Sequence, residues 1–408
     1  MSTVAARRWP PESLAVSVLL TGLVAFGPMS TDMYLASLPA LTQALHTDVA
    51  AAQATLSAFL VGFALSHLAY GPLSDRFGRR PVLLAGVALY VGASVACALA
   101  QTIDGLIAAR FVQALGAGSG PVLARAVVRD VHGRERAATV LAYMGTAMGI
   151  APIVAPILGG YLTAAFGWRA NFVALTGFGA ALLAAVWTGL EETNRRRDAH
   201  AIRPGRIAAN YLGLLRRVDY LSYVGVATCI YGGLFAFISG SSFVLIDWLG
   251  VSAEHFGYAF ATVVLGYVTG TFLAGRFSRR LGSDRMIRIG TAVCALAGAA
   301  LVALALLGAA AVWAIVGPMF VYMVGTGVVL PNAAAGAVGP FPEKAGAASA
   351  LLGFLQMTVS SGVGLAVGFL HDGTPMPMVW AILACAAAGL ALFFWAHRAP
   401  ARRMGAET

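Results

Sequence analysis

Long apolar stretches recur along the chain, and short segments rich in polar residues separate them. A helix of about 18 or more apolar residues is long enough to cross a hydrocarbon layer of roughly 30 Å. The stretches lack the strand-like alternation of an outer-membrane barrel. Because a lipid-exposed backbone must satisfy its own hydrogen bonds, we expect helices. The predicted spans are 14–41, 49–73, 81–100, 103–124, 137–163, 168–189, 220–246, 255–277, 286–308, 310–335, 345–370 and 376–396.

The composition agrees with a chain embedded in a membrane. Hydrophobic residues make up 59% of the 408 residues and charged residues 11%, whereas soluble domains carry about 25% charged residues. A soluble protein of this length could not bury so much apolar surface. The predicted fold class is therefore an all-α polytopic membrane protein with twelve transmembrane helices, and the lipid bilayer is its expected partner.

The net charge of +10 invites a nucleic-acid interpretation, but the placement of the charges argues against one. Of the 27 Lys and Arg residues, 25 lie at the two ends of the chain or in the even-numbered connections between spans. Cytoplasmic loops of membrane proteins carry such an excess of Lys and Arg. We expect both termini to be cytoplasmic and no nucleic-acid partner. Arg169 lies in an odd-numbered connection, and Arg110 lies inside a span.

Motifs for soluble chemistry are missing from the sequence. The four cysteines fall in four different spans, which is neither a disulfide framework nor a metal-binding spacing. No GxxxxGK, HExxH or GxSxG motif occurs, and the chain contains a single lysine, Lys344. We therefore expect neither an enzyme nor an ATP-driven pump, and no metal or cofactor.

The longest connection divides the spans into two sets of six. It covers residues 191–219 and is rich in arginine. The predicted organisation is an N-terminal six-helix half at 1–190, a cytoplasmic linker at 191–219 and a C-terminal six-helix half at 220–408. Repeated six-helix units are a known design of transporters, with the substrate site at the midplane between the repeats.

A comparison of the two sets of spans indicates an internal duplication. At an offset of 204 residues, several glycines, a serine and an arginine coincide, and most of them lie at the turn after the second span of each set. At one position of this turn, Asp75 corresponds to Arg279. The matching pairs are Gly62 and Gly266, Gly71 and Gly275, Ser74 and Ser278, Arg76 and Arg280, Gly78 and Gly282, Gly149 and Gly353, and Gly160 and Gly364.

Several stretches resemble the major facilitator superfamily. "GPLSDRFGRRP" (71–81) resembles its signature loop, "RFVQALGAGSGPVLARAVVRD" (110–130) its helix 4 motif, and "GIAPIVAPILGG" (149–160) its helix 5 antiporter motif. Three further stretches are similar to the bicyclomycin/chloramphenicol-resistance (Bcr/CflA) group of drug:proton antiporters. These are "STDMYLASLPAL" (30–41), "FISGSSFVLIDWLGVSAEHFGYAF" (237–260) and "PNAAAGAVGPFPEKAGAASALLGFLQ" (331–356).

The resemblance implies two six-helix halves related by a pseudo-two-fold axis. It also implies a proton-coupled secondary transporter that exports small amphipathic compounds, including chloramphenicol- or bicyclomycin-like antibiotics, by alternating access. Its partners would be protons and a small-molecule substrate, and its energy source the proton gradient. A monomer in the bacterial cytoplasmic (inner) membrane is expected. A metabolite or amino-acid exporter, or a proton symporter, of the same fold is the alternative.

Asp32 is the one acidic residue well inside an apolar span. A charge at this depth is costly, and such residues usually face a cavity or a partner. Burial favours the neutral carboxylic acid and a nearby cation favours the carboxylate, so we expect Asp32 to exchange a proton during transport. The alternative is a structural acid in a helix kink near Gly27 and Pro28.

Arg110 is the one basic residue inside a span, and its depth is compatible with an interaction with Asp32, either direct or through water. Gln113 shares its helix face, three residues further on. The resemblance implies that Arg110 adjusts the protonation of Asp32 or orders the first span. The alternative is an arginine bonded only to buried carbonyls, which would rigidify the bundle.

A drug site needs aromatic faces and a few polar groups. Tyr34 lies about 200° from Asp32 on an ideal helix, so both face one cavity only if the helix is distorted. His67 is a weaker candidate for a proton relay. The predicted substrate cavity comprises Asp32, Tyr34, Arg110, Gln113, Tyr143, Tyr231, Phe235, Ser239, Asn332 and Gln356.

Span 5 combines prolines with glycines. Prolines bend a helix, and small residues let helices approach closely. A hinge that packs the two halves together is predicted at Gly149, Pro152, Pro156, Gly159 and Gly160.

The loop 71–81 is predicted to be a cytoplasmic gate. By resemblance, Asp75 braces the cytoplasmic start of the eleventh span near Pro342 and Glu343, where a carboxylate is favoured by the helix dipole. One of the nearby arginines would pair with Asp130. The gate residues are Gly71, Asp75, Arg76, Gly78, Arg79, Arg80 and Asp130.

Overall fold

The computed structural model describes residues 9–10, 12–132, 134–194 and 197–404. Long helices dominate these segments, and short 3₁₀ or π turns join some of them. The α-helices are α1 (Leu14–Val24), α2 (Phe26–Asp32), α3 (Leu38–Ala44), α4 (Val49–Phe77), α5 (Arg79–Leu99), α6 (Ile103–Ala117), α7 (Ser119–Val131), α8 (Arg134–Phe166), α9 (Arg169–Gly189), α10 (Pro204–Leu215), α11 (Val218–Ser242), α12 (Ala253–Leu281), α13 (Ser283–Leu306), α14 (Val312–Val338), α15 (Ala345–Phe369) and α16 (Met376–Met404).

The described helices provide the predicted number of membrane crossings. Eleven are long and apolar enough to span a bilayer, and the pieces at Leu14–Val24 and Phe26–Ala44 form a further span bent by 40°. The all-helical prediction with up to twelve spans is confirmed. Two expected spans are interrupted. Span 1 is broken at Ala25 and contains a 3₁₀ turn, Leu35–Ser37, and span 4 is divided at Gly118.

Matching contacts in the two sets of spans reflect the duplication. A methyl group on Gly62 of α4 would meet the carbonyl of Phe111 on α6, and one on Gly266 of α12 would meet the carbonyl of Phe320 on α14. These glycines therefore allow the second and fourth spans of each set to touch through their backbones.

The turn after the second span also repeats. Gly78 and Gly282 have φ values of 105° and 80°, which disfavour residues with a side chain. The backbone N–H of each donates to the serine carbonyl four residues earlier, 3.0 Å away. The sequence match at this turn therefore corresponds to one repeated backbone geometry.

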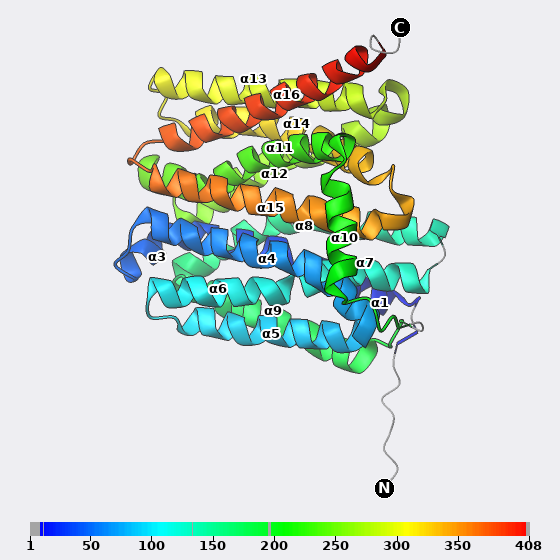
Figure 1. Ribbon diagram of the computed structural model, residues 1–408. Coiled ribbons are helices and arrows are strands. Elements are labelled where there is room, and N and C mark those ends of the chain that lie inside the picture. The colour runs from blue at the N-terminus through cyan, green and yellow to red at the C-terminus, as the bar shows by residue number, and fades with distance from the viewer. Residues whose placement is uncertain (1–8, 11, 133, 195–196, 405–408) are drawn as a thin grey trace.

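Figure 1 shows how the two sets of spans meet. The blue-to-cyan helices of the first set lie on one side and the yellow-to-red helices of the second on the other, with α4 beside α15. Contacts of α4 with α15 and of α8 with α12 form most of the inter-half interface. The start of α1 and the end of α16 lie at the same end of the bundle as α10.

The inter-half interface is tightly packed at the end remote from α10. Methyl groups on Gly160 and Gly257 would meet the Ala253 carbonyl and the Ile157 backbone. The hydroxyl of Ser242 donates to the carbonyl of Leu35, 2.6 Å away. This end of the bundle is closed.

A reciprocal pair of hydrogen bonds continues the interface on the other side of the bundle. Ser57 Oγ of α4 donates to the Ser361 carbonyl of α15 at 3.1 Å, and Ser361 Oγ donates to the Ser57 carbonyl at 3.0 Å. One turn further toward the closed end, Gly368 packs against the side chain of Gln53. Small residues thus bring these two helices into backbone contact.

The same four helices separate toward the end that carries α10. Four glycines in the parts of these helices nearer that end have nothing within 4 Å of the position of an added methyl group. The halves are therefore packed at one end and apart at the other. The four glycines are Gly71 of α4, Gly145 of α8, Gly275 of α12 and Gly346 of α15.

The difference in packing between the two ends of the interface can be tested by substituting alanine for two glycines of α8. Gly160→Ala should lower the apparent melting temperature of the purified protein, because overpacking against the Ala253 carbonyl costs about 1–3 kcal/mol. Gly145→Ala adds the same methyl group in open space and should leave it unchanged or raise it. Equal melting temperatures for the two variants would contradict the closed end described above.

Candidate functional site

Asp32 lies at the end of α2, where the helix of span 1 breaks. Its side chain is only 4% exposed, and Oδ1 accepts a hydrogen bond from Thr31 Oγ1 at 2.8 Å. Within the described part of the chain, no Lys, Arg or His side chain forms an ion pair with it. Asp32 is therefore a buried carboxyl group without a cationic partner in this conformation.

The backbone next to Asp32 contacts span 5. A methyl group on Gly159 of α8 would collide with the Met33 carbonyl, so only glycine permits this approach. From the other half, Tyr231 of α11 lies within electrostatic range of Asp32. The carboxyl group thus lies where α2, α8 and α11 come together, close to the inter-half interface.

Arg110 has a different environment. Its side chain is fully buried, and its guanidinium carbon lies 4.3 Å from the ring centre of Phe59, 4.5 Å from that of Tyr34 and 5.7 Å from that of Phe172. Cations are attracted to aromatic faces at such distances. Three rings of the first set of spans therefore hold this charge.

A chain of hydrogen bonds extends from Arg110 back to span 1. Its Nη1 donates to Gln113 Oε1 at 2.5 Å, and Gln113 Nε2 donates to Ser94 Oγ at 2.7 Å. Ser94 Oγ donates to the carbonyl of Tyr90, whose hydroxyl shares a 2.8 Å hydrogen bond with Ser30. The chain reaches α2 two residues before Asp32. Arg110 is therefore connected to the first span through neutral groups.

This geometry corrects part of the predicted cavity. Tyr34 bonds to Thr55 Oγ1 at 2.6 Å and lies beside Arg110. Its contacts are therefore with spans 2 and 4 of its own half. Tyr34, Arg110 and Gln113 are all fully buried in the first set of spans, so they do not line a cavity here.

The candidates from the second set are partly enclosed as well. Phe235 and Ser239 pack against Gly364 of α15, and Asn332 Nδ2 donates to the Val328 carbonyl at 2.8 Å. Tyr231 and Gln356 remain partly exposed. The side chain of Tyr143 lies outside the described residues. His67 Nδ1 is 2.8 Å from the Phe63 carbonyl, beside Gly353, and no acid of the described residues forms an ion pair with it.

The predicted hinge residues lie in one continuous helix, α8, at the inter-half interface. Gly149 faces Val268, and Pro156 borders Gly257. Gly159 and Gly160 contact the Met33 and Ala253 carbonyls, as described above. Pro152 is partly buried inside the same helix. These residues therefore pack the halves together, and whether they bend during transport stays a prediction.

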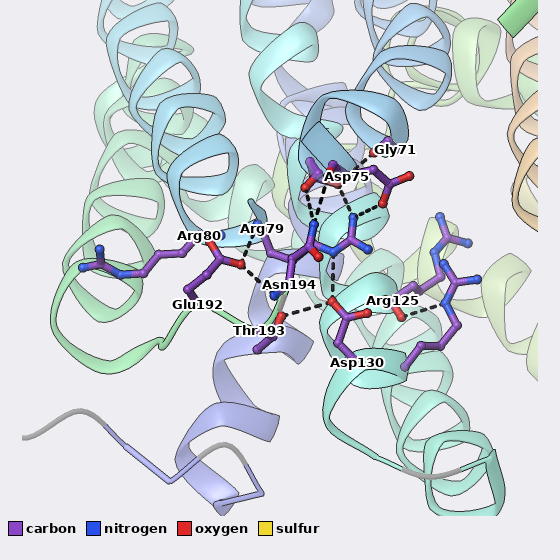
Figure 2. Close-up of polar contacts among 11 residues, drawn as sticks. Gly71, Asp75, Arg79, Arg80, Arg125, Asp130, Glu192, Thr193 and Asn194 are labelled. Atoms are coloured by element: carbon purple, nitrogen blue, oxygen red, sulfur yellow. Dashed lines mark hydrogen bonds and ion pairs between the residues drawn. The ribbon is translucent and has the colours of Figure 1, made fainter. Parts of the chain in front are cut away.

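Arg79 organises the loop between α4 and α5 (Figure 2). Its Nη1 lies 2.6 Å from Asp75 Oδ1 and 2.6 Å from Ser74 Oγ, and its Nε lies 2.9 Å from Asp130 Oδ2 at the end of α7. The ion pair between this arginine cluster and Asp130 is as predicted. Arg79 thus ties the second, third and fourth spans together at the end that carries α10.

The remaining arginines of the loop do not contact Asp130. Arg76 lies over the ring of Phe77, and Arg80 lies over the ring of Trp187 and donates to its carbonyl at 2.7 Å. Asp75 is 48% exposed and pairs with Arg79. The structure therefore differs from the expected brace against Pro342 and Glu343. The halves are apart at this end, which leaves Asp75 bonded within its own half.

Sequence reasoning missed a segment that completes this cluster, the first residues of the linker. Glu192 Oε1 accepts from the N–H of Arg79 at 2.9 Å, and its Oε2 accepts from the N–H of Arg80 at 3.2 Å. Asn194 Nδ2 donates to the carbonyls of Ser74 and Asp75, both at 3.1 Å. A linker segment therefore satisfies unpaired backbone groups of both α4 and α5.

Two further features fit this capping role. A side chain on Gly78 would collide with the Glu192 carboxylate, so glycine is needed there for contact as well as for its φ angle. Thr193 Oγ1 donates to Asp130 Oδ2 at 3.2 Å (Figure 2). The negative charge of Glu192 at the start of α5 also interacts favourably with the helix dipole.

The sequence matches the Major Facilitator Superfamily over residues 19–365. The chain belongs to this family. Major facilitator proteins are transporters rather than enzymes. The inference that the chain is not an enzyme is confirmed.

Several curated members of the family resemble the chain along most of its length. The bicyclomycin resistance protein homolog of Haemophilus influenzae is 31% identical over 94% of this chain and 96% of that protein. The chloramphenicol resistance protein of Pseudomonas aeruginosa is 32% identical over 91% and 88%. Multidrug resistance protein D of Escherichia coli is 30% identical over 85% and 86%. The resemblance to the Bcr/CflA group is confirmed.

Solved structures of other major facilitator proteins have the same fold. A bacterial homolog of the human lysosomal transporter Spinster, in an inward-facing and unoccupied conformation, superimposes with a TM-score of 0.71 at 15% identity and covers 94% of this chain and 96% of that one. The nucleoside transporter NupG gives 0.73 at 15% identity over 94% and 98%. At this identity the likeness concerns the fold alone.

The two adjacent glutamates at the start of the linker of this major facilitator protein allow a matched test. Glu192→Ala removes the acceptor for two N–H groups of α5 and should reduce stability by about 0.5–2 kcal/mol, as loss of a helix cap does. Glu191→Ala removes the same charge from an exposed side chain and should have little effect. Thermal denaturation of both purified variants measures the difference, and equal losses would show that charge, not capping, matters.

Proposed function

We propose that this protein is a proton-coupled secondary transporter that exports small amphipathic compounds, including antibiotics of the chloramphenicol or bicyclomycin kind, by alternating access. One observation supports this mechanism above all: Asp32 is a buried carboxyl group next to the inter-half interface, and no cation of the described residues pairs with it. A carboxyl group in such a place can gain or lose a proton as the two halves move.

The names of the relatives support the proposed substrate class. Resistance to bicyclomycin, to chloramphenicol and to multiple drugs appears among them. These names favour drug efflux over the export of a metabolite or amino acid. The partly exposed side chains of Tyr231 and Gln356 supply an aromatic face and a polar group for such a compound.

Coupling requires that proton and drug stabilise different states of the protein. With the carboxyl group of Asp32 protonated, burial at the closed interface leaves no net charge in the apolar region. Binding of drug next to Tyr231 in the open state favours loss of that proton toward the aqueous side. Exchange requires no more than one proton site and one drug site that are not occupied at the same time.

Arg110 takes a supporting part in this mechanism. Its charge is held by three rings and by Gln113, and it reaches span 1 through Ser94, Tyr90 and Ser30. It fixes the position of the broken helix that carries Asp32. The first set of spans can then move as one body against the second.

The proposed orientation of the protein in the membrane follows from the arginine-rich end of the bundle. The ends of α1 and α16 and the loop after α4 lie there together with α10, and such an excess of arginine marks the cytoplasmic side. We place both termini in the cytoplasm, the protein in a bacterial inner membrane as a monomer, and the separated end of the interface toward the cytoplasm. The proton gradient supplies the energy, without a cofactor.

Neutralising Asp32 should uncouple the exchange. Purified protein is reconstituted in liposomes that contain a pH-sensitive dye, and chloramphenicol is added. Wild type should move protons when drug is added, and Asp32→Asn should show at least a tenfold lower rate. Asp104→Asn removes an exposed carboxylate from the first turn of α6 and is the matched control, expected to behave as wild type. Undiminished proton movement by Asp32→Asn would refute the coupling role.

The loop after α4 should affect movement rather than binding. Asp75→Asn removes the carboxylate that pairs with Arg79 here and that we propose braces the start of α15 when the cytoplasmic end closes. Transport in liposomes should fall severalfold, while the dissociation constant of drug in detergent stays within about twofold. A variant that transports normally, or that loses drug binding, would contradict this role.

A further inference from the structure

The linker contains a helix that crosses the spans instead of running with them. Helix α10 lies in front of α15 in Figure 1 and runs across the spans, and it contacts α11 and α15. A helix that runs across the spans has the direction of a segment lying along a membrane surface. No part of the transport mechanism described above uses it.

One face of α10 is fixed to the second set of spans. Leu214 is buried against a small apolar cluster that includes Val224 of α11 and Leu351 of α15. Tyr220, in the same cluster, donates a hydrogen bond from its hydroxyl to the Ala348 carbonyl at 2.7 Å. This packing fixes which side of α10 faces outward.

The outward side exposes large apolar side chains. Leu212 is 53% exposed and Leu215 is 38% exposed, three residues apart on the helix. The exposed apolar surface continues into α11 with Val218 and Leu221, which are 53% and 36% exposed. Because α11 is a membrane-spanning helix, the exposed leucines of α10 extend the lipid-facing surface of the protein.

Arginines border this apolar surface. Arg203, Arg216 and Arg217 are exposed, and Arg217 lies 3.7 Å from Asp219. Between residues 197 and 219 the sequence has five arginines and two aspartates. A helix with apolar side chains on one face and arginines beside them is typical of a segment that binds the interface of a membrane containing anionic lipid.

We propose that α10 and the first turn of α11 form a binding surface for anionic phospholipid of the adjacent leaflet, with Leu212, Leu215 and Val218 in the acyl region and Arg216 and Arg217 at the phosphates. An acidic protein partner would match the arginines, but it would not account for leucines that are continuous with the lipid-facing side of α11. Lipid accounts for both features.

The binding would act on the connection between the halves. At its start, the linker is held by α4 and α5, where Glu192 and Asn194 cap them and the N–H of Asp198 donates to the Asp75 carbonyl at 3.0 Å. At its end, α10 packs on α11 and α15. Lipid bound at α10 would therefore anchor the linker that joins the two halves to the membrane. Lipid binding at α10 does not depend on which compound the protein transports.

Hydrogen–deuterium exchange tests the proposal on the full-length protein in nanodiscs. Exchange of peptides that cover residues 204–215 is compared in phosphatidylcholine alone, in phosphatidylcholine with phosphatidylglycerol, and in phosphatidylcholine with soluble glycerol phosphate. Phosphatidylglycerol should protect α10, and glycerol phosphate should not. Protection by glycerol phosphate would show an anion site and overturn a membrane-surface role.

Charge-neutral variants separate the proposed surface from a general effect of lipid charge. In the double variant Arg216→Gln and Arg217→Gln, the protection factor gained with phosphatidylglycerol should fall. We expect a decrease of about fivefold for each arginine removed, because one basic residue near an anionic surface contributes roughly that factor to binding. Arg285→Gln with Arg288→Gln removes two exposed arginines of α13 and should retain the protection. Equal exchange of wild type in the two lipids, or full protection of the Arg216 and Arg217 variant, would overturn the proposal.

Discussion

The cost of placing a charge in an apolar medium governs this structure. A cation at the depth of Arg110 is costly without groups that stabilise its charge, and three aromatic rings and one amide surround it, although its Nε and Nη2 have no hydrogen-bond partner among the described residues. The first set of spans is built around that requirement: spans 2, 4 and 6 contribute Phe59, Gln113 and Phe172, and the hydrogen bonds through Tyr90 extend it to span 3. Once Arg110 is enclosed, the break in span 1 has a fixed position.

Asp32 depends on that position but has a different kind of environment. It lies at the edge of the first half, opposite Tyr231 and beside the Met33 carbonyl that Gly159 contacts. A neutral acid is tolerated at a closed apolar interface, and an ionised one is not. In the proposed mechanism, Asp32 changes its protonation state while Arg110, held by other groups, keeps the first set of spans together. Rigid halves and a titrating group between them are what an exchanger requires.

Much of the fold was predictable because its signals are local. Apolar length predicted the spans, and the glycines repeated at an offset of 204 located the turn that recurs at Gly78 and Gly282. The direction of Tyr34 depended on how span 1 breaks, which packing against Gly159 and Gly120 determines. Glu192 was missed because its partners, the backbone N–H groups of α5, lie more than a hundred residues away and leave no pattern in the sequence.

Infrared difference spectroscopy of drug binding measures the protonation state of Asp32 directly. Adding chloramphenicol to purified wild type should remove the carbonyl-stretching band of one protonated carboxyl group and produce a carboxylate band. The change should vanish in Asp32→Asn and persist in Arg110→Lys, since Arg110 bonds to Gln113 and forms no ion pair with Asp32 among the described residues. A carboxyl band that is unaffected by drug, or the same change in Asp32→Asn, would contradict proton–drug exchange at Asp32.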